Sequence, residues 1–527
     1  MQKTRLLNVE EGFTLKPILP HSRLGWGKLA LIYASCMASI PVLLVGFWLA
    51  GNYSLLKIIL IIAISALVVL TFDSFNSVLG TDTGLPASLF ARGCLGNMLA
   101  KIIVSVPLVL VGWGWFGIQL AMAIKSLLVV FGFENLMSSS NSTFIYLLLT
   151  PIVGTLFAFT PITKKLARYG ITNVSIIFLS LFCLISLIIG IRSLYFPVWP
   201  GLLPFSKTEN PDLPLSLGCT ALIGLCASQF VMLSDYSRFA RKIFPDSLLI
   251  PLVGVTPAQV IFAGISAMVG LMISFQPDFF SALISAGVPR WAFILLFFSQ
   301  WNAARLVVIY SAGLAGASLV ENPSYKARQL ITFMSVVVGT MLVALGFQEY
   351  LILFLIIQSI VFAPIGALIA LDHLFIKRRC WQVKTKANLK ALFSLLAGWA
   401  FCIIMFRFFP HSYALLGSTI ISLIIYSLLN FPRLRFNECR RVLEEASGGH
   451  HRKWNNFLLI FALSGLTGAV LFPIIFPTFL GDLLVLVSLF FIAVSTILYL
   501  SGIKGLTIEV MGLELDELPG EGDSYKP

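Results

Sequence analysis

The chain has 527 residues, of which 58% are hydrophobic and 11% are charged, and its formal net charge is +13. Soluble domains carry about 25% charged residues, so this composition excludes an ordinary soluble protein and indicates a membrane protein with many spans. The positive charge then reflects Lys and Arg in loops on one side of the bilayer, not binding of a nucleic acid polymer.

Apolar segments follow one another along the chain, and each is long enough to cross a bilayer, which takes about 20 residues. We predict fourteen of them, at 27–50, 54–79, 98–132, 143–163, 171–190, 212–235, 252–275, 289–318, 327–347, 348–375, 389–409, 412–430, 456–476 and 480–502. The ninth and tenth are divided at the stretch from Gly346 to Tyr350. The fold class is therefore an all-α polytopic membrane protein.

Basic residues predict the orientation in the membrane. With alternating segments and a cytoplasmic N-terminus, 29 Lys and Arg lie on the cytoplasmic side, six lie outside and Arg305 lies within the membrane, out of 36 in the chain. This asymmetry follows the positive-inside rule. We expect an integral plasma-membrane protein, in the inner membrane if the chain is bacterial, with both termini cytoplasmic. Residues 1–26 and the acidic residues 503–527 would form the two tails.

Helix-weakening residues interrupt the first and the sixth segments. They are Ser35, Ser39, Pro41 and Gly46 in the first segment, and Gly218, Gly224 and Ser228 in the sixth. Pro41 removes a backbone donor and disfavours helix at Ile40, and backbone groups freed in lipid must face a cavity or a ligand. Five segments make up residues 27–190 and five make up 212–375, so the second block would enter the membrane inverted, as in secondary transporters. Four further helices would occupy 389–502.

Two residues of the third segment are candidates for substrate binding. Trp115 lies mid-segment, and an indole face suits a flat heterocycle. Gln119 lies one turn further on the same helix face, and its amide can donate to and accept from a heterocycle edge. The alternatives are a packing role for the tryptophan and an interhelical hydrogen bond for the glutamine.

Ionisable residues within the apolar segments are the other candidates. Arg305 keeps its charge, and at the membrane centre it costs roughly 2.5–3.5 kcal/mol, so it needs a partner. It could act as a fixed cation, bind an acidic substrate group in bidentate fashion or form a structural ion pair. Asp73 could pair with it, carry a proton or cap a helix end. We expect Asp235 and Arg238 to form a structural network. We expect Asp372 to lie at a helix end and His373 beside it to be a solvated terminus.

An ordered set of motifs resembles the nucleobase:cation symporter-1 family, whose members include cytosine and hydantoin permeases. The motifs are Ser39-Ile40-Pro41 with Gly46, Thr83-Gly84-Leu85-Pro86, Trp115-Phe116-Gly117 with Gln119, Asp235-Tyr236-Ser237-Arg238-Phe239, Tyr310-Ser311-Ala312-Gly313-Leu314 and Pro364-Ile365-Gly366, within roughly residues 20–380. The resemblance implies a five-plus-five inverted-repeat transporter fold, here with additional C-terminal helices. It also implies uptake of a nucleobase, a hydantoin or a related vitamin with sodium or a proton.

Two departures from the family pattern concern the site. Relatives carry an aromatic residue nine positions before the signature aspartate, where this chain has Cys226 preceded by Leu225. Relatives that use sodium carry two adjacent hydroxyl residues in the eighth helix, and the corresponding positions are alanines. The resemblance implies substrate-binding positions at Ser39, Trp115, Gln119, Leu225, Cys226 and Arg305, and cation-site equivalents at Ala38, Ala303, Ala304 and Arg305. Because a hard cation needs oxygen ligands, we expect sodium-independent transport, with protons as the candidate coupling ion.

Other function classes have less support in the sequence. The eight cysteines show no metal-binding spacing, and no His, Cys or paired carboxylates cluster at a common depth, so we expect neither an enzyme nor a cofactor. Two alternatives remain open at this point. One is a transporter of an amino acid, an amine or a carboxylate-bearing metabolite on the same fold, and the other is a non-transporting membrane receptor or assembly subunit. The sequence leaves the oligomeric state open.

Overall fold

The computed structural model describes residues 17–18, 23–137, 142–159, 174–195, 213–273, 278–305, 311–320, 325–377, 379, 381–409, 413–430 and 479–502. Within these ranges every regular element is a helix, and a parallel β-bridge joins Leu24 to Ala240. The predicted segment at 456–476 and most of both predicted tails lie outside the described residues.

The helices follow in chain order. They are α1 (Trp26–Met37), α2 (Ile40–Asn52), α3 (Leu55–Thr83), α4 (Ala87–Leu95), α5 (Asn97–Ala100), η3 (Lys101–Ser105), α6 (Val106–Val130), η4 (Glu134–Met137), α7 (Ser142–Phe159), α9 (Val174–Tyr195), α10 (Leu215–Ala227), α11 (Gln229–Ser237), α12 (Asp246–Ile250), η6 (Pro251–Val255), α13 (Thr256–Met272), α14 (Phe279–Ser285), η7 (Arg290–Ala292), α15 (Phe293–Arg305), α16 (Gly313–Leu319), α17 (Tyr325–Ala344), η9 (Phe347–Tyr350), α18 (Leu351–Leu371), η10 (Asp372–Ile376), α19 (Leu389–Phe408), α20 (Ala414–Asn430) and α23 (Phe479–Gly502).

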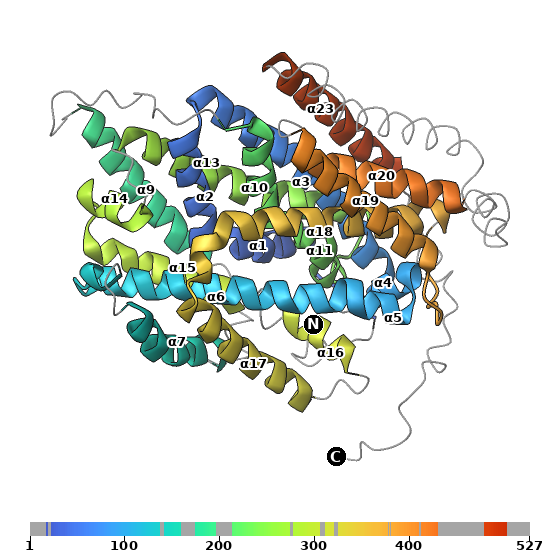
Figure 1. Ribbon diagram of the computed structural model, residues 1–527, viewed down its shortest axis with the longest axis horizontal. Helices are drawn as coiled ribbons and strands as arrows, with labels where there is room; N and C mark the ends of the chain where they lie inside the picture. Colours follow the sequence, from blue (N-terminus) through green and yellow to red (C-terminus); the bar gives the residue numbers. More distant parts are fainter. Residues whose placement is uncertain are drawn as a thin grey trace, which may run out of the picture.

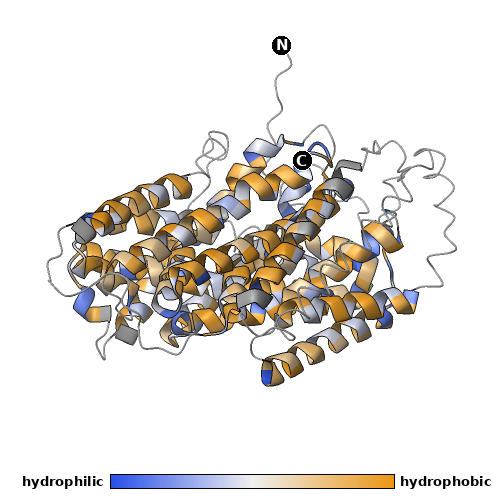
Figure 2. Cartoon of the chain, turned by 90° about the horizontal axis from the view of Figure 1, so that it is seen from above, coloured by the Kyte–Doolittle hydropathy of each residue, from blue (hydrophilic) through white to orange (hydrophobic). Residues whose placement is uncertain are grey.

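Six helical stretches within the described residues are long and apolar enough to cross a membrane. They are Leu55–Thr83, Asn97–Val130, Leu215–Ser237, Asp246–Met272, Phe347–Ile376 and Leu389–Phe408. A bent pair, Trp26–Ser35 with Ile40–Asn52, adds a seventh if it is counted as one span, and five shorter apolar helices accompany them. Hydrophobic residues run along most of these helices (Figure 2). The chain is therefore an integral membrane protein, whereas the count of fourteen spans stays a prediction.

The first helices of the two blocks pack against second helices of the opposite blocks. α2 lies on α13, and α10 with α11 lies on α3. Glycines permit the close approach of α2 to α13 and of α10 to α18, because a side chain at Gly46 would collide with the backbone of Ala263 and one at Gly224 with the carbonyl of Leu355. Around this centre α6 packs against α15 and α17, while α20 and α23 cover α18 and α3 (Figure 1).

The predicted interruption of the first segment is present between α1 and α2. α1 ends at Met37, Ser39 is extended (φ −143°, ψ 159°), and the two helices meet at an angle of 64°. Ile40 is helical, although Pro41 was expected to disfavour helix there. Pro41 occupies the first turn of α2, where no amide donor is needed. The interruption between α10 and α11 is milder, since Ser228 keeps helical angles (φ −62°, ψ −25°).

The predicted division between the ninth and tenth segments is also confirmed. α17 ends at Ala344, and Gly346 adopts φ +71°, a left-handed conformation that glycine tolerates best. The short turn η9 then leads into α18. α18 packs against α10.

Candidate functional site

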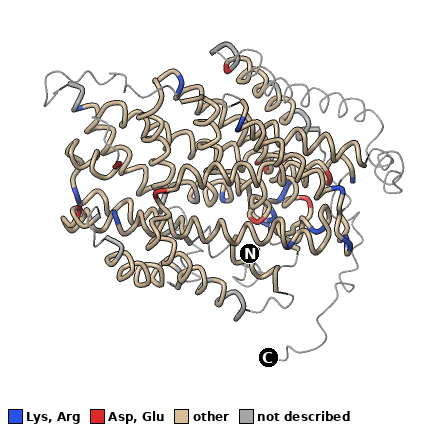
Figure 3. The backbone as a smooth tube through the Cα atoms, viewed as in Figure 1, with Lys and Arg blue, Asp and Glu red and all other residues tan. Residues whose placement is uncertain are grey.

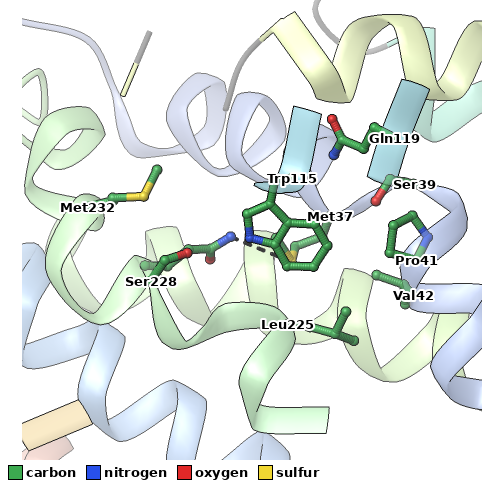
Figure 4. Close-up of a pocket in the computed structure, with 10 residues that line it drawn as sticks. Met37, Ser39, Pro41, Val42, Trp115, Gln119, Leu225, Ser228 and Met232 are labelled. Atoms are coloured by element: carbon green, nitrogen blue, oxygen red, sulfur yellow. Dashed lines mark hydrogen bonds between the residues drawn. The ribbon is translucent and has the colours of Figure 1, made fainter. Parts of the chain in front are cut away.

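A buried pocket lies where α6 meets the two interrupted segments. Its lining residues are Met37, Ser39, Pro41, Val42, Trp115, Gln119, Leu225, Ser228, Gln229 and Met232 (Figure 4). The cavity volume is about 20 Å³, which is room for about one water molecule. In this conformation the site is contracted, and an occupant of nucleobase size requires the lining side chains to move.

Trp115 projects into this pocket from α6 and is held from behind by α18. Its side chain is only 6% exposed, and its Nε1 donates to Oε1 of Gln358 at 3.1 Å. Phe354, one turn before Gln358, meets the indole edge-to-face with 5.4 Å between ring centroids. These two contacts fix the plane of the indole ring, so the ring can serve as a preformed platform for a flat molecule.

Two glutamine side chains bring unused hydrogen-bond acceptors to the pocket. The Oε1 atoms of Gln119 and Gln229 are buried and accept no hydrogen bond from any described residue. Nε2 of Gln229 points to Sδ of Met37 at 3.6 Å. A buried acceptor without a partner costs about 1–3 kcal/mol. A ligand that donates N–H groups would remove that cost, so the pocket favours such a ligand.

Among the described residues, the wall on the α10 side has no aromatic ring, as the sequence indicates. Leu225 lines the pocket, whereas Cys226 lies just behind the lining, with its Sγ 3.6 Å from Sδ of Met37 and 3.3 Å from Oε1 of Gln259. Met232 completes this wall. Thioether and thiol groups are polarizable and adaptable, so this side of the pocket can fit ligands of varied outline.

The predicted cation-site positions lie on helices that touch. α15 packs against both α1 and α2, and Ala38, Ala303 and Ala304 are fully buried. Arg305 is the last residue of α15, and its side chain lies outside the described residues. Sequence reasoning missed Gln300, one turn before Ala304. Its side chain is fully buried, and neither of its amide atoms has a hydrogen-bond partner among the described residues.

Several charged residues that lie at helix ends form a buried network. Figure 3 shows how the charged positions are distributed along the backbone. The carboxylate of Asp82 accepts from Arg379 Nε at 2.9 Å and lies 2.9 Å from His373 Nε2. Asp372 pairs with Lys377 at 2.8 Å. Asp372 lies at the end of α18, as expected. The expectation that His373 is solvated is wrong, because its partner Asp82 on α3 helps to bury its side chain to 2% exposure.

Asp235 and Arg238 belong to the same end of the molecule, in the structural role expected for them. Asp235 accepts a hydrogen bond from the amide of Ala87 at 2.8 Å, which ties α11 to the start of α4. The guanidinium of Arg238 lies 5.1 Å from the ring centroid of Phe239. Nearby, burial lowers the pKa of Arg23, an effect that the charge of Asp82 opposes.

An interrupted first helix, a second interruption at Ser228 and a polar pocket between them, in a chain of apolar spans, define a membrane transporter. Solved transporters share the fold. Mhp1, a nucleobase-cation-symport-1 family transporter, in a closed conformation with bromovinylhydantoin bound, is 18% identical, with 82% of this chain and 98% of that chain covered and a TM-score of 0.58. The inward-facing conformation of Mhp1 is 17% identical. The match covers 82% of this chain and 94% of that chain, with a TM-score of 0.62.

The chain belongs to the family of permeases for cytosine/purines, uracil, thiamine and allantoin, whose sequence model matches residues 20–413. This confirms the resemblance to the nucleobase:cation symporters, and the family and its solved neighbours are transporters, not enzymes. A Na⁺-coupled sialic acid symporter is also similar in fold, with 11% identity, coverage of 77% and 90%, and a TM-score of 0.50. A comparison with curated protein sequences gives no match.

Proposed function

We propose that this protein is a secondary transporter of a small planar heterocycle, such as a nucleobase, a hydantoin or a related vitamin, working by alternating access. The observation that carries the proposal is the pairing of one aromatic platform, Trp115, with the amide oxygens of Gln119 and Gln229, which have no partner among the described residues, around one pocket. A heterocycle with N–H groups on its edge would stack on the indole and donate to these oxygens.

The interrupted helices would supply the rest of the site. Ser39 and Ser228 stand at the two interruptions and line the same pocket. Since the pocket is contracted here, the transport cycle would widen it from one side and then from the other. Reciprocal packing of α2 on α13 and of α10 on α3 supports an inverted repeat of 27–190 and 212–375, followed by the C-terminal helices of 389–502.

Transport would not depend on sodium. Ala38, Ala303 and Ala304 have no side-chain oxygen, and a hard cation needs several oxygen ligands. Gln300 could supply one oxygen from the same helix, which is too few. A guanidinium at Arg305 would also repel a monovalent cation by roughly 4 kcal/mol at 4 Å with an effective dielectric constant of 20. We expect Arg305→Ala to impair transport, and the remaining transport to stay independent of sodium.

The orientation that we propose places both termini in the cytoplasm. The network around Asp82 would then lie at the cytoplasmic side, where the basic loops of the sequence also lie. It would hold the ends of α3 and η10 together while the pocket is closed to that side.

A ligand panel tests the proposed function. Purified protein is heated with nucleobases, hydantoins, vitamins, amino acids and amines in turn, and each compound that raises Tm is then tested for uptake into proteoliposomes. We expect a planar heterocycle to raise Tm by binding the folded state, and to enter the liposomes. Stabilisation by amino acids or amines alone would favour a transporter of another substrate class, and binding without uptake would favour a receptor.

A further inference from the structure

Asp73 is a buried carboxyl group that the proposed site leaves unexplained. It lies within α3, ten residues before the end of the helix at Thr83, and its side chain is fully buried. Neither carboxyl oxygen has a hydrogen-bond partner among the described residues. It therefore does not cap the helix end. An ionised carboxylate in such surroundings costs several kcal/mol unless a cation or a set of donors compensates it.

The surroundings of Asp73 contain no described cation that could do so. Several helices pack against α3. Three of them, α2, α13 and α18, have no ionisable group among their described residues, and five others are α4, α10, α11, α12 and α23. The ionisable groups described on those five helices are Arg92, Cys94, Cys219, Cys226, Asp235, Tyr236, Asp246 and Asp482. Of these, Cys226 lies close enough to Asp73 for an electrostatic interaction. A thiol offers no positive charge, so no described group would compensate a negative charge on Asp73 in this conformation.

The position of Asp73 links the pocket to the charged end of the molecule. On one side, Cys226 lies against Met37, which lines the pocket. On the other side, Ser77 lies one turn further along the same face of α3, and its buried hydroxyl has no partner among the described residues. Three residues beyond, Gly80 lets the hydroxyl of Ser237 come against α3. Polar groups therefore continue from Asp73 toward the Asp82 end.

We propose that Asp73 is the proton-binding group that couples transport to a proton gradient. When the pocket is open to one side, water reaches the carboxylate and an O–H bond forms with a proton from that water. The neutral acid then passes through the closed state described here. When the other side opens, the O–H bond breaks and the proton returns to water there. This inference rests on the proposed function, because it assumes that the pocket beside Asp73 carries a substrate.

The test uses full-length protein in proteoliposomes with the membrane potential clamped by potassium and valinomycin. The probe is a heterocycle that the panel shows to be taken up. A pH gradient, acidic outside, should drive its accumulation, by about tenfold per pH unit for one proton per substrate, and a protonophore should abolish it. Asp73→Asn keeps the shape and cannot ionise, so it should bind substrate and exchange it in counterflow, yet lose the gradient-driven accumulation.

Two further variants complete the design. Asp73→Glu keeps an ionisable group and should retain part of the accumulation. Asp482→Asn alters a carboxyl group on α23 that accepts from the Tyr413 hydroxyl at 3.1 Å, and it should respond to the gradient like wild type. Folding of every variant is checked by size-exclusion chromatography and Tm.

The outcomes separate this inference from the proposed function. Wild-type uptake that does not depend on the pH gradient, or gradient-driven accumulation by Asp73→Asn, would overturn the role of Asp73. Neither result would contradict the transport function. Absence of uptake for every panel compound would overturn the proposed function itself. If Asp73 is instead the ion-pair partner of Arg305, wild-type uptake should ignore the gradient and Asp73→Asn should lose stability, which also overturns the inference. Should Asp73→Asn not fold, the wild-type and Asp73→Glu measurements still decide.

Discussion

Replacing Trp115 by alanine should separate its binding role from its packing role. The indole is the one aromatic ring among the pocket-lining residues, and stacking of a base on an aromatic side chain contributes about 1–3 kcal/mol. Its loss should weaken substrate binding roughly 5- to 150-fold, since each 1.4 kcal/mol is tenfold. The variant also deletes a buried tryptophan and leaves Oε1 of Gln358 without its donor at 3.1 Å, so Tm should fall as well.

Two controls make this prediction decisive. Trp115→Phe keeps an aromatic face but loses the hydrogen bond to Gln358 and part of the buried ring. It should therefore be less stable and bind more nearly like wild type than Trp115→Ala does. Trp113→Ala removes a partly buried tryptophan two residues earlier on α6, which does not line the pocket, and its substrate affinity should not change. Affinity is measured by isothermal titration on protein that is monodisperse and folded. Unchanged affinity in Trp115→Ala, or equal losses in the two alanine variants, would refute the assigned site.

Three other predictions address the amide, the charge network and the topology. Gln119→Leu should weaken binding by about 0.5–1.5 kcal/mol at little cost in Tm, because no described residue donates to its Oε1. Equal affinity in titration would contradict its role. Asp82→Asn leaves Arg379 without its buried carboxylate and should lower the free energy of unfolding by about 3 kcal/mol, whereas a chemical denaturation curve like that of wild type would argue against the network. A cysteine introduced at Pro277 should react with an impermeant reagent from outside and one at Gly448 should not; the reverse pattern would disprove the proposed orientation.

Hydrophobic patterning was sufficient to predict the class and much of the helical layout. Long apolar runs have one stable solution in lipid, because every backbone group must be hydrogen-bonded within the segment. The interruption at Ser39 and the turn at Gly346 were predictable for a local reason, since proline and glycine impose their own backbone geometry. Ser228 was harder, because the chain there keeps helical angles and bends little.

Candidate site residues could be picked out from the sequence only where a polar or aromatic residue is unusual within an apolar segment. Trp115 and Gln119 stand out in an apolar helix, and the structure places both at the pocket. Gln229 was missed because it follows the interruption at Ser228, where a polar residue at a helix start is unremarkable. The burial of His373 was unpredictable, because its partner Asp82 lies 291 positions away in the chain. Pairings over such separations depend on tertiary packing, which sequence periodicity does not encode.

The most direct test of the central claim is uptake of a stabilising heterocycle into proteoliposomes, with sodium replaced by choline at constant ionic strength. The proposed site predicts saturable uptake that is the same in both salts and is greatly reduced in Trp115→Ala. A saturable, several-fold stimulation by sodium would contradict it. That result would show that other oxygens complete a cation site beside Ala303 and Ala304, and Gln300 would be the first residue to replace.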